Sequence, residues 1–283
     1  MSGTAPSGRT QEIELRLLLE AIYLRFHHDF RHYSPASMKR RIQAALPRLG
    51  CNSISGLQER LLQDPSTFFE LLQYLTVQVS DMFRDPGYYR VLREQIVPIL
   101  GTYPSLKIWI AGCSSGEELY SFAILLQEEG LLERTILYAT DINPEALRKA
   151  ELGVYPLDRV AAFTENHRAS GAKRSLSECY TARYDAAAFD RALRKNVVFS
   201  DHSLATDTVF GEMQLVSCRN VLIYFDRTLQ DRAVGLMSDS LCRRGFLGLG
   251  SRETLQFSKH ATTFDELVAD GTAAGGERWY RKC

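Results

Sequence analysis

Apolar positions in the first third of the chain recur at helical spacing. The segment IELRLLLEAIYLRF places apolar residues three or four positions apart, which is typical of a helix with one buried face. Two later segments, YSPASMKRRIQAAL and QDPSTFFELLQYL, each offer a candidate N-cap, Ser34 and Asp64, before a proline at the first helical position. No strand pattern appears there, so we predict an all-helical N-terminal domain over residues 11–80, after a disordered tail at residues 1–10.

The pattern changes after the segment RDPGYYRVLREQIVPIL, which predicts one more helix beginning at an Asp-Pro pair. From there, short and mostly apolar runs that end in small or polar residues alternate with helix-like segments. These runs are LKIWIAG, TILYATD, NVVFSD, MQLVSC and FLGLGS. Because such runs are typical of a mostly parallel sheet covered on both faces, we predict an α/β domain over residues 81–283. Residues 156–195, with short runs of mixed charge, interrupt the alternation.

Length and composition narrow the class of protein. At 283 residues a single core usually divides, which suits one small and one large domain. The 34 Lys and Arg residues equal the 34 Asp and Glu residues in number, so net charge gives no general argument for a polyanionic partner. No apolar run approaches the roughly 20 residues of a membrane span and the N-terminus lacks a signal-peptide core, so we expect a cytoplasmic protein. Six cysteines without C-x-x-C spacing indicate reduced thiols and no metal site.

Polar side chains follow four of the predicted strands, at the point where each strand ends. In open α/β sheets the ligand lies beyond the carboxyl ends of the strands, so these groups form a candidate site. They are the turn 112–118, Asp141, residues 201–204 and residues 218–220.

The turn between the first strand and its helix constrains the ligand. Glu117 and Glu118 stand at the start of the helix, where they would repel a phosphate, so a dinucleotide is disfavoured. A carboxylate there suits a cationic ligand, and Asp141 at the next strand end is placed to accept hydrogen bonds from both hydroxyls of a ribose. A ligand with a ribose, an ammonium group and no phosphate is S-adenosylmethionine. The alternative is that both glutamates only complement the positive N-terminus of the helix.

Four segments resemble the signature segments of the CheR-type methyltransferases. Three of them are AGCSSGEELYS, ATDINPEALRKAELGVY and CRNVLIYFD, and VSDMFRD is similar to that family's Asn-x-Thr-x-Phe-Phe-Arg segment. The family transfers methyl groups from S-adenosylmethionine to glutamate side chains of bacterial chemoreceptors. The resemblance implies a protein-glutamate O-methyltransferase with a Rossmann-like methyltransferase fold, a small all-helical N-terminal domain, and a small inserted antiparallel β subdomain at about residues 156–195.

The resemblance also implies the site residues. The positions that match cofactor-contacting positions or lie in the signature turn are Gln78, Ser80, Arg84, Gly112, Glu118, Asp141, Ser203, Leu204, Arg219 and Asn220. Tyr224 matches the tyrosine that the family has near the reacting centre, and Arg84 can present a planar fork to a carboxylate, so these two are the predicted catalytic residues. Gln78, Ser80, Met82 and Ser203 depart from the residues that the family usually has there, which predicts cofactor binding with altered affinity.

The segment from Arg25 to Arg48 is locally basic, with Asp29 as its one acidic residue. Lys39, Arg40 and Arg41 near the start of a predicted helix could face the acidic methylation region of a receptor, and such docking would be sensitive to salt. The alternative is a solvated helix face. We expect a monomer without nucleic-acid partners. Two other functions remain open, methylation of another protein carboxylate and a regulatory protein that binds S-adenosylmethionine without turnover.

Overall fold

The computed structural model describes residues 8–78, 80–267 and 276–283. The chain forms two compact units. Residues 1–77 together with 224–230 form the helical unit, and residues 78–223 together with 231–283 form the α/β unit. Over the described residues, no helix has both the length and the apolar character that a bilayer crossing would need.

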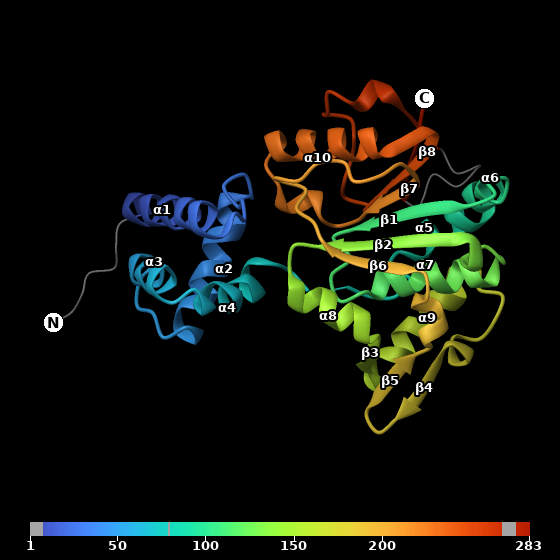
Figure 1. The fold of residues 1–283 in the computed structure, drawn as a ribbon, viewed down its shortest axis with the longest axis horizontal. Coiled ribbons are helices and arrows are strands. Elements are labelled where there is room, and N and C mark those ends of the chain that lie inside the picture. Colours follow the sequence, from blue (N-terminus) through green and yellow to red (C-terminus); the bar gives the residue numbers. More distant parts are fainter. Residues whose placement is uncertain (1–7, 79, 268–275) are drawn as a thin grey trace. The chain divides into compact units, whose positions relative to one another are not determined.

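Four helices build the helical unit (Figure 1). They are α1 (Gly8–Phe26), α2 (Pro35–Arg48), α3 (Ile54–Gln63) and α4 (Ser66–Leu75). The helical spacing read from the sequence corresponds to their buried faces, because Leu15, Leu18, Leu19 and Ile22 of α1 are all buried. Helix α1 packs against α3, and α2 packs against α4.

Two details at the helix starts differ from the prediction. Helix α1 begins at Gly8, so residues 8–10 are helical and not part of a tail, and residues 1–7 of that predicted tail lie outside the described residues. Ser34 precedes α2 but its side chain makes no capping bond. Asp64 does act at the start of α4, since its carboxylate accepts a hydrogen bond from the Ser66 backbone nitrogen at 3.0 Å.

Residues 224–230 join the helical unit although they are distant from it in sequence. Tyr33 and Phe225 form an isolated antiparallel bridge. The Ser34 nitrogen donates to the Tyr224 carbonyl at 2.8 Å, and the Asp226 nitrogen donates to the His32 carbonyl at 2.8 Å. Backbone pairing of this kind has no local sequence pattern, so the sequence placed this segment in the second domain.

A seven-stranded sheet in the order β6-β2-β1-β7-β8-β10-β9 forms the centre of the α/β unit (Figure 1). Its strands are β1 (Leu106–Ala111), β2 (Thr135–Asp141), β6 (Val197–Asp201), β7 (Met213–Cys218), β8 (Leu241–Leu249), β9 (Phe264–Glu266) and β10 (Arg278–Lys282). Strands β6, β2, β1, β7 and β8 are parallel to one another, and β10 runs antiparallel to β8 and β9. The five predicted strands and the mostly parallel sheet are therefore confirmed.

Helices and a small second sheet complete this unit. The helices are α5 (Pro86–Val91), η1 (Leu92–Ile96), α6 (Val97–Leu100), α7 (Glu117–Glu128), η2 (Leu132–Arg134), α8 (Pro144–Leu152), η3 (Leu157–Arg159), α9 (Val160–Ala169), η4 (Leu176–Cys179), η5 (Arg191–Arg194), η6 (Leu222–Tyr224), α10 (Arg227–Ser240) and η7 (Ala261–Thr263). The last residue of η6 and the first residues of α10 belong to the helical unit. Strands β3 (Val154–Pro156), β5 (Ala186–Phe189) and β4 (Tyr180–Arg183) form the small sheet in that order, and both of its pairings are antiparallel. This confirms the predicted small antiparallel insertion.

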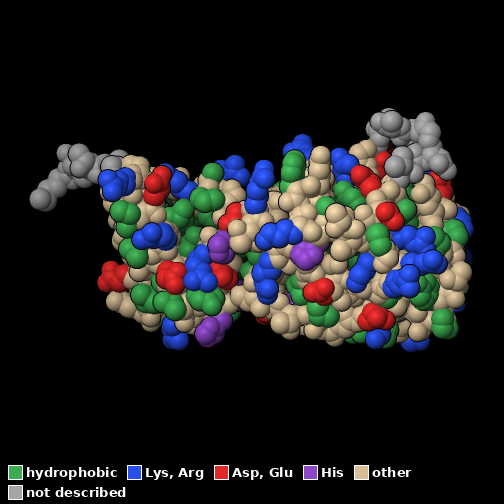
Figure 2. Space-filling view, turned by 90° about the horizontal axis from the view of Figure 1, so that it is seen from above, with side chains coloured by type: hydrophobic (Ala, Val, Ile, Leu, Met, Phe, Trp, Pro, Cys, Tyr) green, Lys and Arg blue, Asp and Glu red, His purple; other side chains and the backbone are tan. Residues whose placement is uncertain are grey.

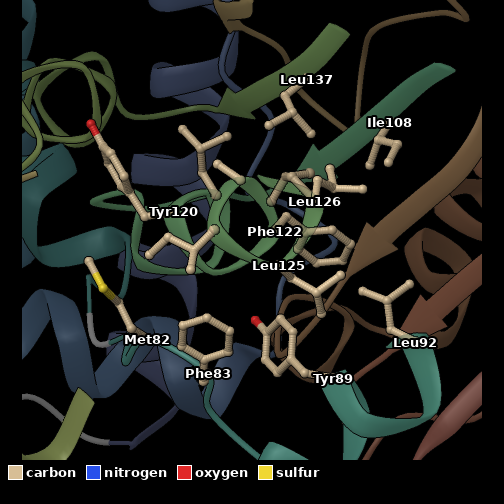
Figure 3. Close-up of a cluster of buried hydrophobic side chains, with 14 of the residues drawn as sticks. Met82, Phe83, Tyr89, Leu92, Ile108, Tyr120, Phe122, Leu125, Leu126 and Leu137 are labelled. Carbon is tan, nitrogen blue, oxygen red and sulfur yellow. The ribbon is translucent and has the colours of Figure 1, made fainter. Parts of the chain in front are cut away.

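The core of the α/β unit lies around α7. Figure 3 shows Phe122 and Leu125 of this helix close to Tyr89 and Leu92, which come from the α5–η1 helical stretch, and all four side chains are buried. Burying a side chain of this size contributes about 1.5–3 kcal/mol. Because this core holds the first turn of α7 and the segment before α5, it fixes the loops from which the candidate site is built.

Candidate cofactor-binding site

The turn between β1 and α7 requires glycine at two positions. Gly112 has φ +70° and a Cβ there would lie 2.5 Å from Val221 Cγ2. Gly116 has φ +94° and a Cβ there would lie 2.8 Å from the Ala150 Cβ. The glycines therefore let this turn pack closely against the segment after β7 and against α8. Within the turn the Ser114 hydroxyl is buried and has no hydrogen-bond partner among the described residues, so it is available to a ligand.

The two glutamates that open α7 have different partners. Glu117 is fully buried, and its carboxylate accepts hydrogen bonds from Ser115 Oγ at 2.8 Å and from Arg159 Nη1 at 2.8 Å. Glu118 accepts from Ser217 Oγ at 2.6 Å and from Arg219 Nη1 at 3.4 Å, and its side chain remains 14% exposed. Glu117 therefore fixes the turn, whereas Glu118 lies toward the carboxyl end of β7 and is accessible.

Asp141 connects the ends of two strands. Its Oδ2 accepts from the Ser114 nitrogen at 2.9 Å and its Oδ1 accepts from the Asn143 nitrogen at 3.0 Å. Burial raises the pKa of this carboxyl group, against the lowering effect of these backbone donors. Because each carboxylate oxygen can accept more than one hydrogen bond, Asp141 can hold the turn and still accept from ligand hydroxyls.

Arg219 is a buried cation near these carboxylates, with 1% of its side chain exposed. It donates to Asp85 Oδ2 at 2.8 Å and to the Arg84 carbonyl at 2.7 Å, and its guanidinium lies 4.1 Å from the centre of the Tyr88 ring. Burial alone would lower the pKa of Arg219, but Glu118 and its other neighbours raise it above the ordinary value. Arg219 thus connects Glu118 to the segment before α5, and its contact with the cofactor stays a prediction.

Arg84 lies in a constrained backbone. Its neighbours Phe83 and Asp85 have φ of 52° and 57°, a conformation that costs non-glycine residues about 1–3 kcal/mol each. The partly buried Arg84 guanidinium makes no hydrogen bond or ion pair with any described residue, unlike that of Arg219. A strained segment thus presents a cation that has no counterion among the residues the structure describes.

The loop after β7 is held by a buried carboxylate. Glu253 accepts from the backbone nitrogens of Asn220 at 2.9 Å, Gly250 at 2.7 Å and Ile223 at 3.3 Å. Burial raises the pKa of Glu253. Asn220 itself has φ of 59°, so this carboxylate stabilises an unusual backbone conformation at a predicted cofactor-contacting position.

The other predicted cofactor positions of the α/β unit also have partners. Gln78 Oε1 accepts from Lys149 Nζ at 3.3 Å, and the Ser80 carbonyl accepts from Arg159 Nη2. The Ser203 nitrogen donates to Asp207 Oδ2 at 2.9 Å, and Leu204 is buried.

Tyr224, the second predicted catalytic residue, belongs by its contacts to the helical unit. Its ring centre lies 4.5 Å from the Arg41 guanidinium carbon, and Arg41 Nη1 donates to the Leu75 carbonyl. Arg41 is buried, so the prediction that it belongs to an exposed basic surface is wrong; Arg40 is exposed and Lys39 is partly buried. Figure 2 shows Lys and Arg side chains of the helical unit interspersed with Asp and Glu on the face in view.

Three residues whose side chains bond the candidate site residues were not identified from the sequence. Arg159 reaches Asp81 across 78 positions of sequence, so no local motif reveals it. Ser217 was visible only as part of an apolar run, and Asp85 only as a helix start. Within the described residues, no cluster of three or more His, Cys, Asp or Glu side chains could hold a metal ion.

Comparisons with known proteins cover both units. The family described as "CheR methyltransferase, SAM binding domain" matches residues 78–270, and the one described as "CheR methyltransferase, all-alpha domain" matches residues 13–76. The chain is 58% identical to a putative methyltransferase, Cher3, of Pseudomonas putida over 262 residues, which cover 93% of this chain and 96% of that protein. It is 31% identical to a chemotaxis protein methyltransferase of Listeria innocua, over 80% of this chain and 84% of that protein. For a chemotaxis protein methyltransferase of Salmonella typhimurium the identity is 25%, over 97% of this chain and 96% of that protein.

Proposed function

The chain belongs to the CheR methyltransferase family, and from this premise we propose that it transfers methyl groups from S-adenosylmethionine to glutamate side chains of bacterial chemoreceptors. The family resemblance stated from the sequence is confirmed. The family is defined by an S-adenosylmethionine-binding domain, so that molecule is the cofactor. The observation that most supports the proposal is the match of both domains to this family, together with relatives named as chemotaxis protein methyltransferases.

The described residues fit this cofactor. The glycines at 112 and 116 let the turn pack closely against neighbouring segments, and the buried Ser114 hydroxyl has no hydrogen-bond partner among the described residues. Glu118 offers an accessible carboxylate for an ammonium group, and Asp141 offers acceptors for ribose hydroxyls. A phosphate would be repelled by the same carboxylates, so the donor and acceptor set favours S-adenosylmethionine over a dinucleotide.

The chemistry of the proposed reaction makes modest demands on the protein. When bound, S-adenosylmethionine supplies a methyl group on a positively charged sulfur, and a carboxylate oxygen displaces that sulfur as the new carbon–oxygen bond forms. A glutamate with an ordinary pKa of about 4.3 is already ionised at neutral pH, so no general base is needed. The protein therefore has to position the two reactants and exclude water.

We assign the positioning to Arg84 and Tyr224. The Arg84 guanidinium has no counterion among the described residues, so it is available to bind a carboxylate in a bidentate manner. Tyr224 offers a hydroxyl that can orient the incoming side chain. For the receptor, we propose that Lys39 and Arg40 attract the acidic methylation region, because both lie on α2 and retain exposed surface.

The proposal is tested by incubating the protein with methyl-labelled S-adenosylmethionine and membranes that contain chemoreceptors. We expect label in the receptor band that mild base releases as methanol, because methyl esters hydrolyse in base whereas methylated amines do not. Label on another protein would support methylation of a different carboxylate. Cofactor binding without any label would support a regulatory protein, and either result would reject the receptor assignment.

A further inference from the structure

We propose that Arg159 is a positioning residue for the cofactor site, through which the region beside the small sheet holds both the α7 turn and the segment that carries Ser80. This inference deepens the proposed function and rests on it. Arg159 ends the short helix η3, which follows strand β3 of the small sheet, and it matches none of the site positions predicted from the sequence.

The Arg159 guanidinium joins two segments that are distant in sequence. Its Nη1 donates to Glu117 Oε1 at 2.8 Å, and its Nη2 donates to Asp81 Oδ1 at 2.8 Å and to the Ser80 carbonyl. The guanidinium carbon also lies 4.8 Å from the centre of the Phe163 ring, which restricts its orientation. One side chain therefore fixes the distance between the start of α7 and the segment before α5.

Both ends of this connection belong to the candidate site. The second Glu117 oxygen accepts from Ser115 Oγ, and Glu118 is the next residue along α7. On the other side, the Asp81 carbonyl accepts from the Arg84 nitrogen at 3.4 Å. A shift of Arg159 would therefore disturb the accessible carboxylate of Glu118 and the Arg84 guanidinium together.

Neighbouring residues of the same region reinforce the connection. The Tyr155 hydroxyl of β3 donates to the Ser115 carbonyl at 2.8 Å. Asn166 Nδ2 of α9 donates to the Met82 carbonyl at 3.1 Å. Residues 155–166 thus contact the α7 turn and the 80–84 segment at several points. Of Tyr155, Arg159 and Asn166, only Arg159 contacts both segments with its side chain.

Loss of Arg159 would leave Glu117 as a buried carboxylate without its cation. The turn must then open to admit water to that carboxylate, and the cofactor must close it again on binding. Because the Arg159 side chain is 33% exposed, water already weakens its ion pairs, so we expect a moderate loss of affinity, about tenfold.

Calorimetric titration with S-adenosylhomocysteine tests the inference. We expect the dissociation constant to rise about tenfold in Arg159→Met and less in Arg159→Lys, which keeps one charged donor. Arg174→Met is the matched control, because it removes an exposed ion pair, with Glu178 at 3.6 Å, from the same part of the chain. We expect this control to bind as the unaltered protein does.

The outcomes separate this inference from the proposed function. If the unaltered protein fails to bind S-adenosylhomocysteine, the proposed function fails. If the unaltered protein binds and Arg159→Met binds equally well, even with a lower melting temperature, Arg159 is only structural and the inference is overturned. If Arg159→Met fails to fold, the same titration is made with Arg159→Lys and Asp81→Asn. An unchanged affinity for S-adenosylhomocysteine in both variants would overturn the inference.

Discussion

At the scale of single residues, the adjacent glutamates Glu117 and Glu118 differ in their partners and in their exposure. Glu117 is buried against Arg159 and Ser115, whereas Glu118 bonds Ser217 and Arg219 and stays accessible. The alternative that both acids only complement the helix N-terminus does not account for these specific side-chain partners. The turn geometry separates the two side chains, so Glu117 holds the turn while Glu118 stays available for the proposed ligand contact.

Replacing Arg84 should affect turnover much more than stability. Because its guanidinium has no partner among the described residues, Arg84→Ala should change the free energy of unfolding by no more than about 0.5 kcal/mol. At saturating receptor and cofactor it should lower turnover about 10- to 100-fold, since we propose that Arg84 positions the reacting carboxylate, and interactions made only as the transition state forms appear in kcat. Urea unfolding and steady-state kinetics measure the two effects.

Arg219→Ala is the contrasting variant for this test. Its loss should destabilise the fold by about 1–3 kcal/mol, because it removes a buried side chain that donates to Glu118, to Asp85 and to the Arg84 carbonyl. An Arg84→Ala protein with normal turnover, or one that is as unstable as Arg219→Ala, would contradict the role assigned to Arg84.

The sequence identified residue types in motifs better than it identified their partners. Glu118, Asp141 and Asn220 were visible because each follows a recognisable strand. Arg159 was not visible, because a long side chain that bridges distant segments leaves no periodic or local signal. The burial of Arg41 was missed for a related reason, since its cover comes from Leu75 and Tyr224 and not from its own helix.

At the scale of elements, the apolar runs predicted the strands β1, β2, β6, β7 and β8 because these strands are buried by their neighbours. Strands β9 and β10 were missed. Strand β9 has three residues, and β10, RWYRK, has charged residues at three of its five positions, so neither forms an apolar run. Pairing with β8 fixes β10, and tertiary pairing of this kind overrides local propensity.

Helix α2 provides a prediction that separates neighbouring cations. Arg41→Ala should destabilise the helical unit by about 1–3 kcal/mol, because it removes a donor from the buried Leu75 carbonyl. Arg40→Ala should leave stability unchanged and raise the apparent receptor KM, with a smaller effect at high salt. Thermal unfolding and receptor titrations at two salt concentrations test this. Equal effects of the two substitutions on stability and on the apparent receptor KM would refute the different roles of Arg40 and Arg41.

The end of α7 provides a prediction about pH. Glu128 bonds Arg93 Nη2 at 2.7 Å and His167 Nε2 at 3.1 Å, within a network that also includes Glu129 and Lys173. Burial alone would raise the pKa of Glu128, but the bonds from His167 and Arg93 bring it below its ordinary value of 4.5. A carboxyl group with a lowered folded-state pKa stabilises the fold above its unfolded-state pKa, and this contribution is lost as the pH falls through the folded-state value.

Glu128→Gln should therefore cost about 3 kcal/mol at neutral pH, and the difference from the unaltered protein should shrink as the pH falls below 4.5. Glu133→Gln is the matched control, since Glu133 is 82% exposed and pairs with Lys195 at 3.9 Å, and it should cost less than about 1 kcal/mol. Urea unfolding at several pH values measures the change in the free energy of unfolding for both variants. A Glu128→Gln cost that stays constant with pH would show that this carboxylate is not the titrating group.

At the scale of the whole molecule, the chain returns from the cofactor-binding unit to the helical unit within a few residues. Asn220 lies in the loop that Glu253 holds, and Tyr224, four positions later, pairs with Ser34 of the helical unit. The family matches divide the chain near the same place as the two units, at residues 76 and 78. The sequence motifs were sufficient to recognise the family and the cofactor, whereas the contribution of residues 224–230 to the helical unit required the structure.

We propose that this methyltransferase acts on receptor glutamates. The most direct test is peptide mapping by mass spectrometry of a purified chemoreceptor after incubation with S-adenosylmethionine and either the unaltered protein or Arg84→Ala. We expect a gain of one methyl group on specific glutamate side chains, which mild base removes and which Arg84→Ala strongly reduces. Methyl groups on lysine, arginine or a chain terminus, or an unmodified receptor in the presence of protein that binds the cofactor, would contradict it.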